Sequence, residues 1–382
     1  MSQPTHPFRH SAFKPTLPTL FALLLWLCSI NVQADNPPAV IAIAGPMAGS
    51  SLSIGLQYRA GVTAAIQSLT EDGMLLGRKM TISLHDDNCN AEIAASLAEQ
   101  IVLTPPAVVI GHSCSAATIA AAPIYAKHNV LEITPASTHP QVTEMGINSI
   151  FRMIGRDDQQ GSMAADYIAR HYQNKHIGIV YFPGEYSKNL ALLTLSELEK
   201  RQIKPVKSIQ TIALSASYTK VIAELLSADV DALYIVGGGL DTAIFLKEAR
   251  QLGAKFKVIG SDTFVSNVFI KTAGEAANGS VFTFPPETAK LQSSMPAQTA
   301  IRALGQEPAG YTLLAYAATQ AWILGVQKAQ SFEAEQVANA LRAAPLETIL
   351  GPISFDAKGD IMTSYSPFSW YIWTDGKRAV VN

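Results

Sequence analysis

The chain has 382 residues, of which 48% are hydrophobic and 15% charged, with 28 basic and 30 acidic residues. This composition indicates a folded globular protein. The chain is longer than a single hydrophobic core usually accommodates, so we expect two lobes. The slight excess of acidic residues argues against nucleic acid or an anionic membrane as a partner.

The first 34 residues are predicted to form a secretory signal peptide. They combine a basic segment with Arg9 and Lys14, an apolar core over 17–30, and small residues before a cleavage site after Ala34. The apolar core is too short to span a membrane comfortably, and no later segment is long and apolar enough to do so. Cleavage leaves 26 basic against 30 acidic residues, a formal charge of about −4. The sequence therefore predicts an exported protein.

Two cysteines, Cys89 and Cys114, remain once Cys28 leaves with the signal peptide. An even number of cysteines in an oxidising compartment favours a disulfide bond over two free thiols. Without a supporting cluster of histidines, the pair makes a poor metal site, and we expect neither a metal nor a cofactor.

The predicted elements alternate between short apolar strands and helices, which is typical of parallel sheets with helices on both faces. In the first part, strands are predicted at 40–45, 80–84, 107–110 and 130–133, a loop at 45–55, and helices at 61–69, 91–103 and 116–125. In the second part, strands are predicted at 177–182, 206–212, 232–236 and 257–259, and helices up to 171 and at 187–200, 218–226 and 241–252. The segment 281–284, with the two prolines that follow it, is predicted as a crossing between the lobes. The last part is predicted as helices at 311–329 and 333–344, a hairpin-like turn at 355–360 and a strand at 369–373.

Small or polar residues follow four strands of the first part, at 45–49, 86–89, 113–115 and 135–138. Ligands of parallel sheets bind outside the carboxyl ends of the strands, so we expect these four tips to converge. Ser115 is predicted as the N-cap of the helix at 116–125, where free N–H groups and the helix dipole attract a carboxylate or phosphate. An ordinary strand–turn–helix joint with a serine cap is the alternative interpretation of this segment.

The enzyme motifs in this chain are incomplete. The segment Gly111-His112-Ser113 begins like a nucleophile elbow, but Ser115 stands where the last glycine is required. No P-loop lysine motif is present, and the glycines after the first strand have the wrong spacing for a dinucleotide loop. Because no set of nucleophile, base and orienting group is visible, the sequence predicts a protein that is not an enzyme.

Three segments together resemble signatures of one family: Asp86-Asp87-Asn88-Cys89, Gly111-His112-Ser113-Cys114-Ser115 and Ile133-Thr134-Pro135-Ala136-Ser137-Thr138. The family is that of the periplasmic leucine/isoleucine/valine-binding proteins, the substrate-binding components of branched-chain amino acid ABC transporters. Further similar segments run from Val40 to Trp373, namely Phe151-Arg152, Gly155, Gly161, Glu185-Tyr186, 260–267, Gly351-Pro352 and 355–360.

The resemblance implies an α/β fold of the type I periplasmic binding proteins, with two Rossmann-like lobes joined by a three-crossing hinge. Lobe 1 is expected at 35–154 and 285–356, and lobe 2 at 155–284 and 357–382. The crossings are expected near 154–155, 284–285 and 356–359. A ligand is then enclosed between lobes that close on it, in the manner of a Venus flytrap.

The resemblance also assigns ligand-binding residues. Ser115, Ala136 and Thr138 match the residues that hold the α-carboxylate and α-amino groups of the ligand. From the second lobe, Tyr186 matches a binding tyrosine, and Asp262 stands where the best-known members have a glutamate that pairs with the ammonium group. The cap of a helix starting near Val265 is the alternative role for Asp262.

Two pocket positions depart from the resembled family. Ile54 and Gly238 stand where the family has tyrosines, so aromatic bulk is missing from the pocket walls. The expected function is a periplasmic, monomeric binding protein that captures an amino acid, branched-chain or otherwise aliphatic, and delivers it to a membrane permease. The alternative is a sensing module of the same fold that binds an amide, urea or a small organic acid.

Overall fold

The computed structural model describes residues 1–4, 7 and 36–381. The apolar core predicted for the signal peptide and the cleavage site after Ala34 lie outside these residues. Pro38–Asn382 form one compact unit, which contains all the described helices and strands. Among the described residues, none of the helices combines the length and the apolar character needed to cross a membrane.

The first lobe is built on a six-stranded sheet with the order β2-β3-β1-β4-β5-β6, in which the β2–β3 pair alone is antiparallel. The strands are β1 (Ala39–Gly45), β2 (Met74–Leu75), β3 (Arg78–Asp86), β4 (Val108–Ile110), β5 (Glu132–Thr134) and β6 (Ile150–Arg152). The helices between them are α2 (Leu52–Leu69), α3 (Ala91–Ile101), α4 (Ser115–Lys127) and the short α5 (Gln141–Glu144). Every residue of β4, β5 and β6 is buried, as expected of central parallel strands covered on both faces.

The second lobe is built on a seven-stranded sheet with the order β16-β15-β11-β10-β9-β7-β8. Its strands are β7 (Ile177–Tyr181), β8 (Lys207–Gln210), β9 (Ala232–Val236), β10 (Lys257–Gly260), β11 (Val281–Phe284), β15 (Ser369–Thr374) and β16 (Lys377–Val380). Its helices are α6 (Asp157–Tyr172), α7 (Glu185–Lys200), α8 (Thr219–Ser227), α9 (Gly239–Gln251) and α10 (Asn267–Ala273). The strands from β7 to β11 run parallel, and β15 and β16 are added antiparallel.

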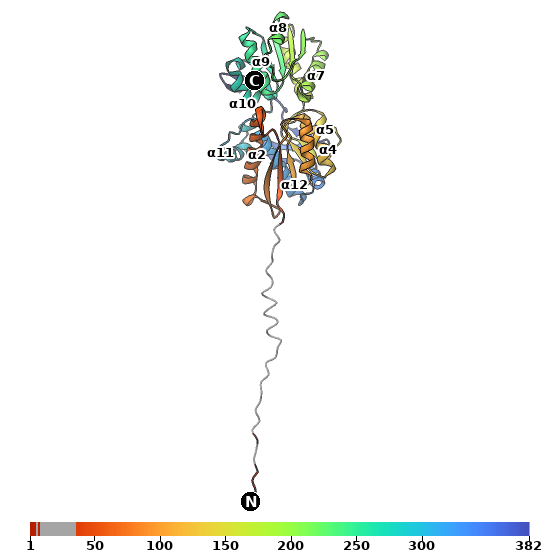
Figure 1. Cartoon of the computed structure of the whole chain (residues 1–382), viewed down its shortest axis with the longest axis vertical. Coiled ribbons are helices and arrows are strands. Elements are labelled where there is room, and N and C mark those ends of the chain that lie inside the picture. Colours follow the sequence, from red (N-terminus) through yellow and green to blue (C-terminus); the bar gives the residue numbers. More distant parts are fainter. Residues whose placement is uncertain (5–6, 8–35, 382) are drawn as a thin grey trace. The chain divides into compact units, whose positions relative to one another are not determined.

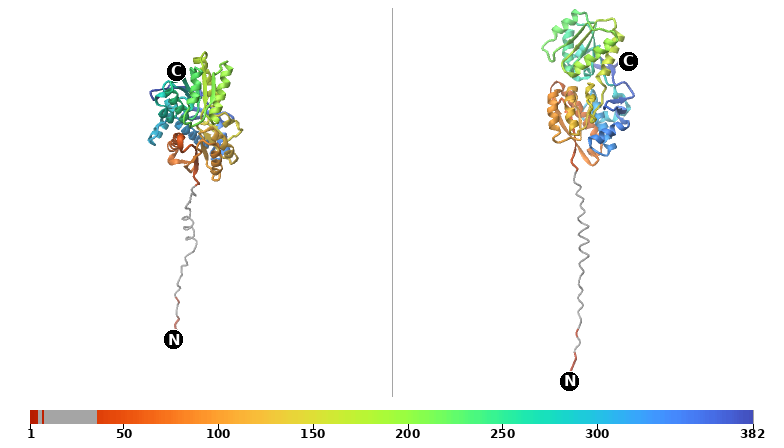
Figure 2. Two further views of the ribbon diagram at one scale, coloured as in Figure 1. Left: turned by 45° about the horizontal axis from the view of Figure 1, so that its top comes forward. Right: turned by 90° about the vertical axis from the view of Figure 1, so that its right-hand side faces the viewer.

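The chain returns to the first lobe after β11. The returning elements are α11 (Met295–Ala303), α12 (Thr312–Ala329), α13 (Ala334–Ala343) and a three-stranded sheet of β12 (Leu346–Thr348), β13 (Gly351–Phe355) and β14 (Ile361–Thr363). Figure 1 shows α11 and α12 in the same lobe as α2 and α4, with α7 to α10 in the other lobe. In the right-hand view of Figure 2, the blue C-terminal segments likewise lie beside the orange N-terminal ones.

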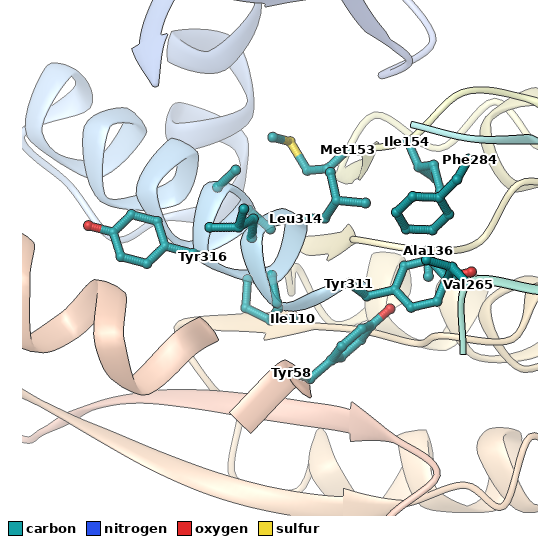
Figure 3. Packing of buried hydrophobic residues seen from close by; sticks show 14 of the residues in the cluster. Tyr58, Ile110, Ala136, Met153, Ile154, Val265, Phe284, Tyr311, Leu314 and Tyr316 are labelled. Carbon is teal, nitrogen blue, oxygen red and sulfur yellow. The ribbon is translucent and has the colours of Figure 1, made fainter. Parts of the chain in front are cut away.

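Helix α12 packs directly on α2, and a glycine makes this possible. A Cβ atom at Gly61 of α2 would lie 2.3 Å from the carbonyl oxygen of Thr312, so a larger residue would separate the helices. Figure 3 shows the core that results, in which Leu314 of α12 packs near Ile110 of β4 and Met153. The returning helices therefore complete the core of a lobe whose sheet formed much earlier in the chain.

Most predicted elements are confirmed within a few residues, but α2 begins at Leu52 inside the segment predicted as a loop. The loop was predicted from the small residues that fill the segment between Gly45 and Gly55. In the structure a Cβ atom at Gly55 would lie 2.3 Å from the carbonyl oxygen of Pro46, so this glycine allows close packing within a helix. Helices α5 and α11 and strands β2, β6, β11, β12, β13, β14 and β16 were not predicted as elements.

Three crossings connect the lobes, at 153–156, 285–287 and 364–368. The first two coincide with the predicted positions. At the third predicted position, 356–359, the structure has a hairpin turn between β13 and β14, in which the Asp356 carboxylate accepts the N–H groups of Lys358, Gly359 and Asp360, each at 2.9 Å. The predicted lobe ranges stay a prediction. Because β13 pairs with β14, the last lobe boundary fits better at 364–368 than at 356.

A buried ion-pair network joins the hairpin turn to the first crossing. Asp360 accepts Nε–H of Arg152 at 2.8 Å and Nη1–H of Arg156 at 2.9 Å, and Thr143 donates its hydroxyl at 2.8 Å. Burial acts to raise the pKa of Asp360, but the charge of Arg152 and the hydrogen bonds outweigh it, so the pKa lies below its usual value. The network thus stabilises the ionised carboxylate in the folded state.

We expect the substitution Asp360→Asn to destabilise the protein by about 3 kcal/mol at pH 7, because it leaves the buried Arg152 guanidinium without its counter-ion. The folded-state pKa is depressed, so the parent keeps this stabilisation above about pH 4 and loses it as the pH falls through the folded-state pKa. Denaturant unfolding between pH 3 and 8 measures the difference. Asp158→Asn, which removes an exposed partner of Arg156, is the control and should cost less than about 1 kcal/mol. Equal losses in the free energy of unfolding for the two variants would contradict the proposed importance of the buried Arg152–Asp360 pair.

Candidate functional site

The main candidate site is a cavity of about 300 Å³ that is lined by residues of both lobes. It opens at the carboxyl ends of parallel strands, where α/β folds bind their ligands. All five residues that the resemblance singled out line it, namely Ser115, Ala136, Thr138, Tyr186 and Asp262. Ile54 and Gly238 line it as well. The structure therefore brings the predicted residues together, and their roles toward a ligand stay a prediction.

Ser115 lies at the start of α4, but it is not the N-cap that the sequence predicted. The helix begins one residue earlier than expected, with Cys114 in the capping position and Ser115 as the first helical residue. The Ser115 hydroxyl oxygen instead accepts the N–H of His139 at 3.2 Å. This bond joins the helix start to the neighbouring turn at 135–138, and the prediction missed it because the partner is 24 residues away.

The turn with Ala136 and Thr138 is held from behind by buried hydroxyl groups. The Thr134 hydroxyl oxygen accepts the N–H groups of Ala136 at 3.3 Å and Ser137 at 3.0 Å, and it donates to the carbonyl of His112 at 2.7 Å. Ser137 donates to the same carbonyl at 3.1 Å. Because these groups are buried and paired, the turn is fixed before any ligand arrives.

Cys89 and Cys114 form a disulfide bond, with their Cα atoms 5.3 Å apart, which confirms the predicted pairing. The bond joins the tips after β3 and β4, and Cys114 is the residue directly before Ser115. Asp87 supports the same place, because its carboxylate accepts the N–H of Cys89 at 2.8 Å and contacts His112 Nδ1 at 2.6 Å. The disulfide therefore fixes the start of α4 at the wall of the cavity.

We expect the double variant C89S/C114S to have a free energy of unfolding about 3 kcal/mol lower than the parent, because the bond closes a loop of 25 residues in the unfolded chain. Denaturant titration without reductant measures this. As a control, the parent in reductant should unfold at the same denaturant concentration as the variant. Alkylation of two thiols in the unreduced, denatured parent, seen by mass spectrometry, would show that the bond is absent.

On the second-lobe side, a fully buried carboxylate is held by two tyrosines. The hydroxyl of Tyr186 donates to Asp262 Oδ1 at 2.5 Å, and that of Tyr311 donates to Oδ2 at 2.8 Å. Burial raises the pKa of Asp262, and the two tyrosine hydroxyls oppose this increase. The alternative role as a helix cap is not what the structure shows, since Ser266 caps α10 with its oxygen 3.3 Å from the N–H of Phe269.

Tyr311 was missed by the sequence analysis, and it belongs to the opposite lobe from Asp262. Its N–H donates to Gln57 of α2 at 2.6 Å, and its ring packs against Phe284 with 5.4 Å between centroids. Figure 3 shows Tyr311 between Tyr58 and Phe284, close to Ala136. The hydrogen bond from Tyr311 to Asp262 therefore joins the two lobes beside the cavity. No local pattern marks this residue, because its partner lies 49 positions away.

Asp157 is a second buried carboxylate that the sequence analysis did not single out. It begins α6, and its N–H donates to the carbonyl of Thr138 at 2.8 Å. Burial raises its pKa to about 8; Thr138 and Asn189 lie close enough to oppose this partly. Among the described residues, none forms a hydrogen bond of normal geometry with either carboxylate oxygen. The folded protein therefore takes up a proton at Asp157 near neutral pH.

The substitution Asp157→Asn should stabilise the protein, increasingly so at higher pH. The folded-state pKa is raised, so the parent loses stability as the pH rises from about 4 toward 8, while an amide does not titrate. The difference in free energy of unfolding should grow by up to about 1.4 kcal/mol per pH unit between pH 5 and 7. Denaturant unfolding at several pH values measures it, with Asp158→Asn as the neighbouring exposed control. A pH-independent difference would contradict the buried protonated carboxyl.

The fold and the cavity define a two-lobed binding protein, and the comparisons agree with this class. The periplasmic binding protein family matches residues 38–370. The Leu/Ile/Val-binding protein homolog 1 of Brucella abortus is 32% identical over 340 residues, covering 88% of this chain and 92% of that protein. A leucine-, isoleucine-, valine-, threonine- and alanine-binding protein of Pseudomonas aeruginosa is 31% identical over 345 residues, covering 90% and 92%. The crystal structure of the leucine-binding protein LivK of Thermotoga maritima is 24% identical, with a TM-score of 0.80, covering 90% of this chain and 98% of that one.

This chain belongs to the family of periplasmic binding proteins that includes the Leu/Ile/Val-binding proteins, the substrate-binding components of branched-chain amino acid ABC transporters. The family and the type I fold with two lobes were both predicted from the sequence and are confirmed. Its relatives are solute-binding proteins and not enzymes, as was also predicted.

Proposed function

We propose that this protein captures an α-amino acid with a branched-chain or other aliphatic side chain between its two lobes and delivers it to the permease of an ABC transporter. It does so as a monomer in the periplasm, after removal of a signal peptide that ends at Ala34. The main support is that one cavity holds hydroxyl and N–H groups of one lobe together with a buried carboxylate of the other. The names of the relatives, which bind leucine, isoleucine and valine, support the same ligand class.

The ligand carboxylate is proposed to bind to the first lobe, at Ser115, Ala136 and Thr138. The start of α4 lies there, so free N–H groups and the positive end of the helix dipole favour a negative charge. The turn with Ala136 and Thr138 is held rigid by its buried hydrogen bonds, so little ordering is required when the carboxylate binds.

The ligand ammonium group is proposed to pair with Asp262, with Tyr186 beside it. A buried ammonium group needs an anionic partner once water is excluded. Each carboxylate oxygen of Asp262 already accepts one tyrosine hydroxyl, and each retains a further lone pair for the ammonium group. The tyrosines thus orient the carboxylate and leave it able to accept the ligand.

Closure of the lobes follows from the ligand contacting both of them. A ligand shifts a conformational equilibrium by the difference between its affinities for the two states, and an amino acid held at both ends favours the closed one. The three crossings at 153–156, 285–287 and 364–368 are the segments on which the lobes are proposed to turn. The permease can then distinguish the closed, loaded protein from the open one.

Thermal denaturation of the purified protein with single amino acids tests this function. Leucine, isoleucine or valine at about 100 times its Kd should stabilise the protein by about 2.7 kcal/mol. Asp262→Asn should weaken binding by 100-fold or more, about 2.7 kcal/mol, because the ammonium group is then buried without a charged partner. Asparagine keeps an acceptor oxygen for one tyrosine hydroxyl, and its NH2 group can donate to the oxygen of the other. Glu335→Gln, on an exposed position of α13, is the matched control.

Equal affinity of the parent and the Asp262→Asn variant for leucine would contradict the ammonium role. Stabilisation by an amide, urea or a small organic acid, with none by any amino acid, would favour the alternative of a sensing module with a different ligand. A panel with all these ligand classes separates the two ligand assignments in one experiment.

A further inference from the structure

The cavity has an open space beside Gly238 that ends at a carboxylate. The backbone of Gly238 has φ −63° and ψ 149°, which any residue can adopt, so the main effect of the glycine is the space that it leaves. A Cβ atom at this position would meet one heavy atom within 4 Å, Oδ2 of Asp241 at 3.6 Å. The space that the glycine leaves therefore leads to Asp241.

The Asp241 carboxylate is held in place through its other oxygen. Oδ1 accepts the N–H of Leu214 at 2.6 Å and the hydroxyl of Tyr218 at 3.4 Å. Asp241 lies in the first turn of α9, where the helix dipole stabilises its negative charge. Two bonds on Oδ1 leave Oδ2 directed toward the space beside Gly238, so a ligand group that enters this space meets a fixed, charged acceptor.

The charges that line the cavity are all negative. Its described lining residues include the carboxylates of Glu185, Asp241 and Asp262 and no lysine, arginine or histidine. None of these three carboxylates belongs to an ion pair among the described residues. A zwitterionic head group brings no net charge, so an aliphatic amino acid leaves the excess negative charge uncompensated.

We propose that this cavity also accepts an α-amino acid whose aliphatic side chain ends in a cation, with the cation paired to Asp241. The inference rests on the proposed function, because it uses the same head-group site at Ser115 and Asp262. The apolar side chains of Ile54, Leu240 and Val268 line the cavity and can cover the methylene stem. Leucine-like and lysine-like ligands thus share the head-group site and the apolar wall, and the cationic ones alone reach Asp241.

Isothermal titration calorimetry with leucine, norleucine, ornithine and lysine tests this proposal. Norleucine has an unbranched apolar side chain, so its comparison with lysine isolates the terminal charge. We expect lysine or ornithine to bind the parent more tightly than norleucine, and this advantage to decrease as the salt concentration rises. Asp241→Asn should weaken binding of the cationic ligand at least 10-fold and change leucine binding less than 2-fold. Glu335→Gln, which removes a negative charge outside the cavity, should change neither affinity.

Gly238→Tyr provides a second variant that leaves Asp241 in place. The tyrosine should fill the space in front of the carboxylate, so binding of lysine and ornithine should be lost while leucine still binds. Binding of leucine by the parent without detectable binding of any cationic amino acid would overturn this inference and leave the proposed function intact. Unchanged lysine affinity in Asp241→Asn would overturn it too. A parent that binds no amino acid at all would overturn both proposals.

Discussion

The site depends above all on one buried guanidinium, that of Arg152. It donates Nε–H to Asp360 at 2.8 Å, Nη1–H to the carbonyls of Ser137 at 3.1 Å and His139 at 2.8 Å, and Nη2–H to Thr143 at 2.5 Å. A buried charge of this size is tolerated only when its donors are paired, so each of these partners is held in position. The turn with Ala136 and Thr138, the hairpin after β13 and the first crossing are thereby fixed to one another. This wall of the cavity is therefore connected directly to the segment where the lobes are joined.

The second lobe contributes two buried carboxyl groups, those of Asp262 and Asp157, and a buried carboxylate is costly unless it is paired. Asp262 is held by hydroxyl groups from both lobes, and Asp157 lies under the backbone of Thr138 with its carboxylate oxygens unpaired among the described residues. Both carboxyl groups have raised pKa values because burial disfavours their charge. Of the two, Asp262 lines the cavity, so a cationic group that enters there lowers the cost of burying this carboxylate.

The two ends of the cavity differ in how strongly they are constrained. At the end with Ser115, Ala136 and Thr138, the disulfide bond, the buried hydroxyl network and the start of α4 fix positions through several independent contacts. At the other end, Gly238 leaves space, and Asp241 is held by contacts within its own lobe. Changes of side chain at this second end therefore disturb fewer of the contacts that hold the fold.

The sequence by itself determined the alternation of strands and helices, the convergence of the strand tips, the disulfide pair and the resemblance that led to Ser115, Ala136 and Thr138. The first two follow from local periodicity and from the rule that parallel strands end at a common edge. The disulfide follows from an even number of cysteines in an exported chain, and the three site residues follow from the family resemblance alone. The tertiary structure alone decided that α2 begins at Leu52, that Ser115 bonds to His139 instead of capping, and that Tyr311 reaches Asp262 from the other lobe. The last two depend on a partner distant in the sequence, and the start of α2 depends on the packing of Gly55 against Pro46. The burial of a group, which sets its pKa and its hydrogen bonds, exists only once the lobes have packed.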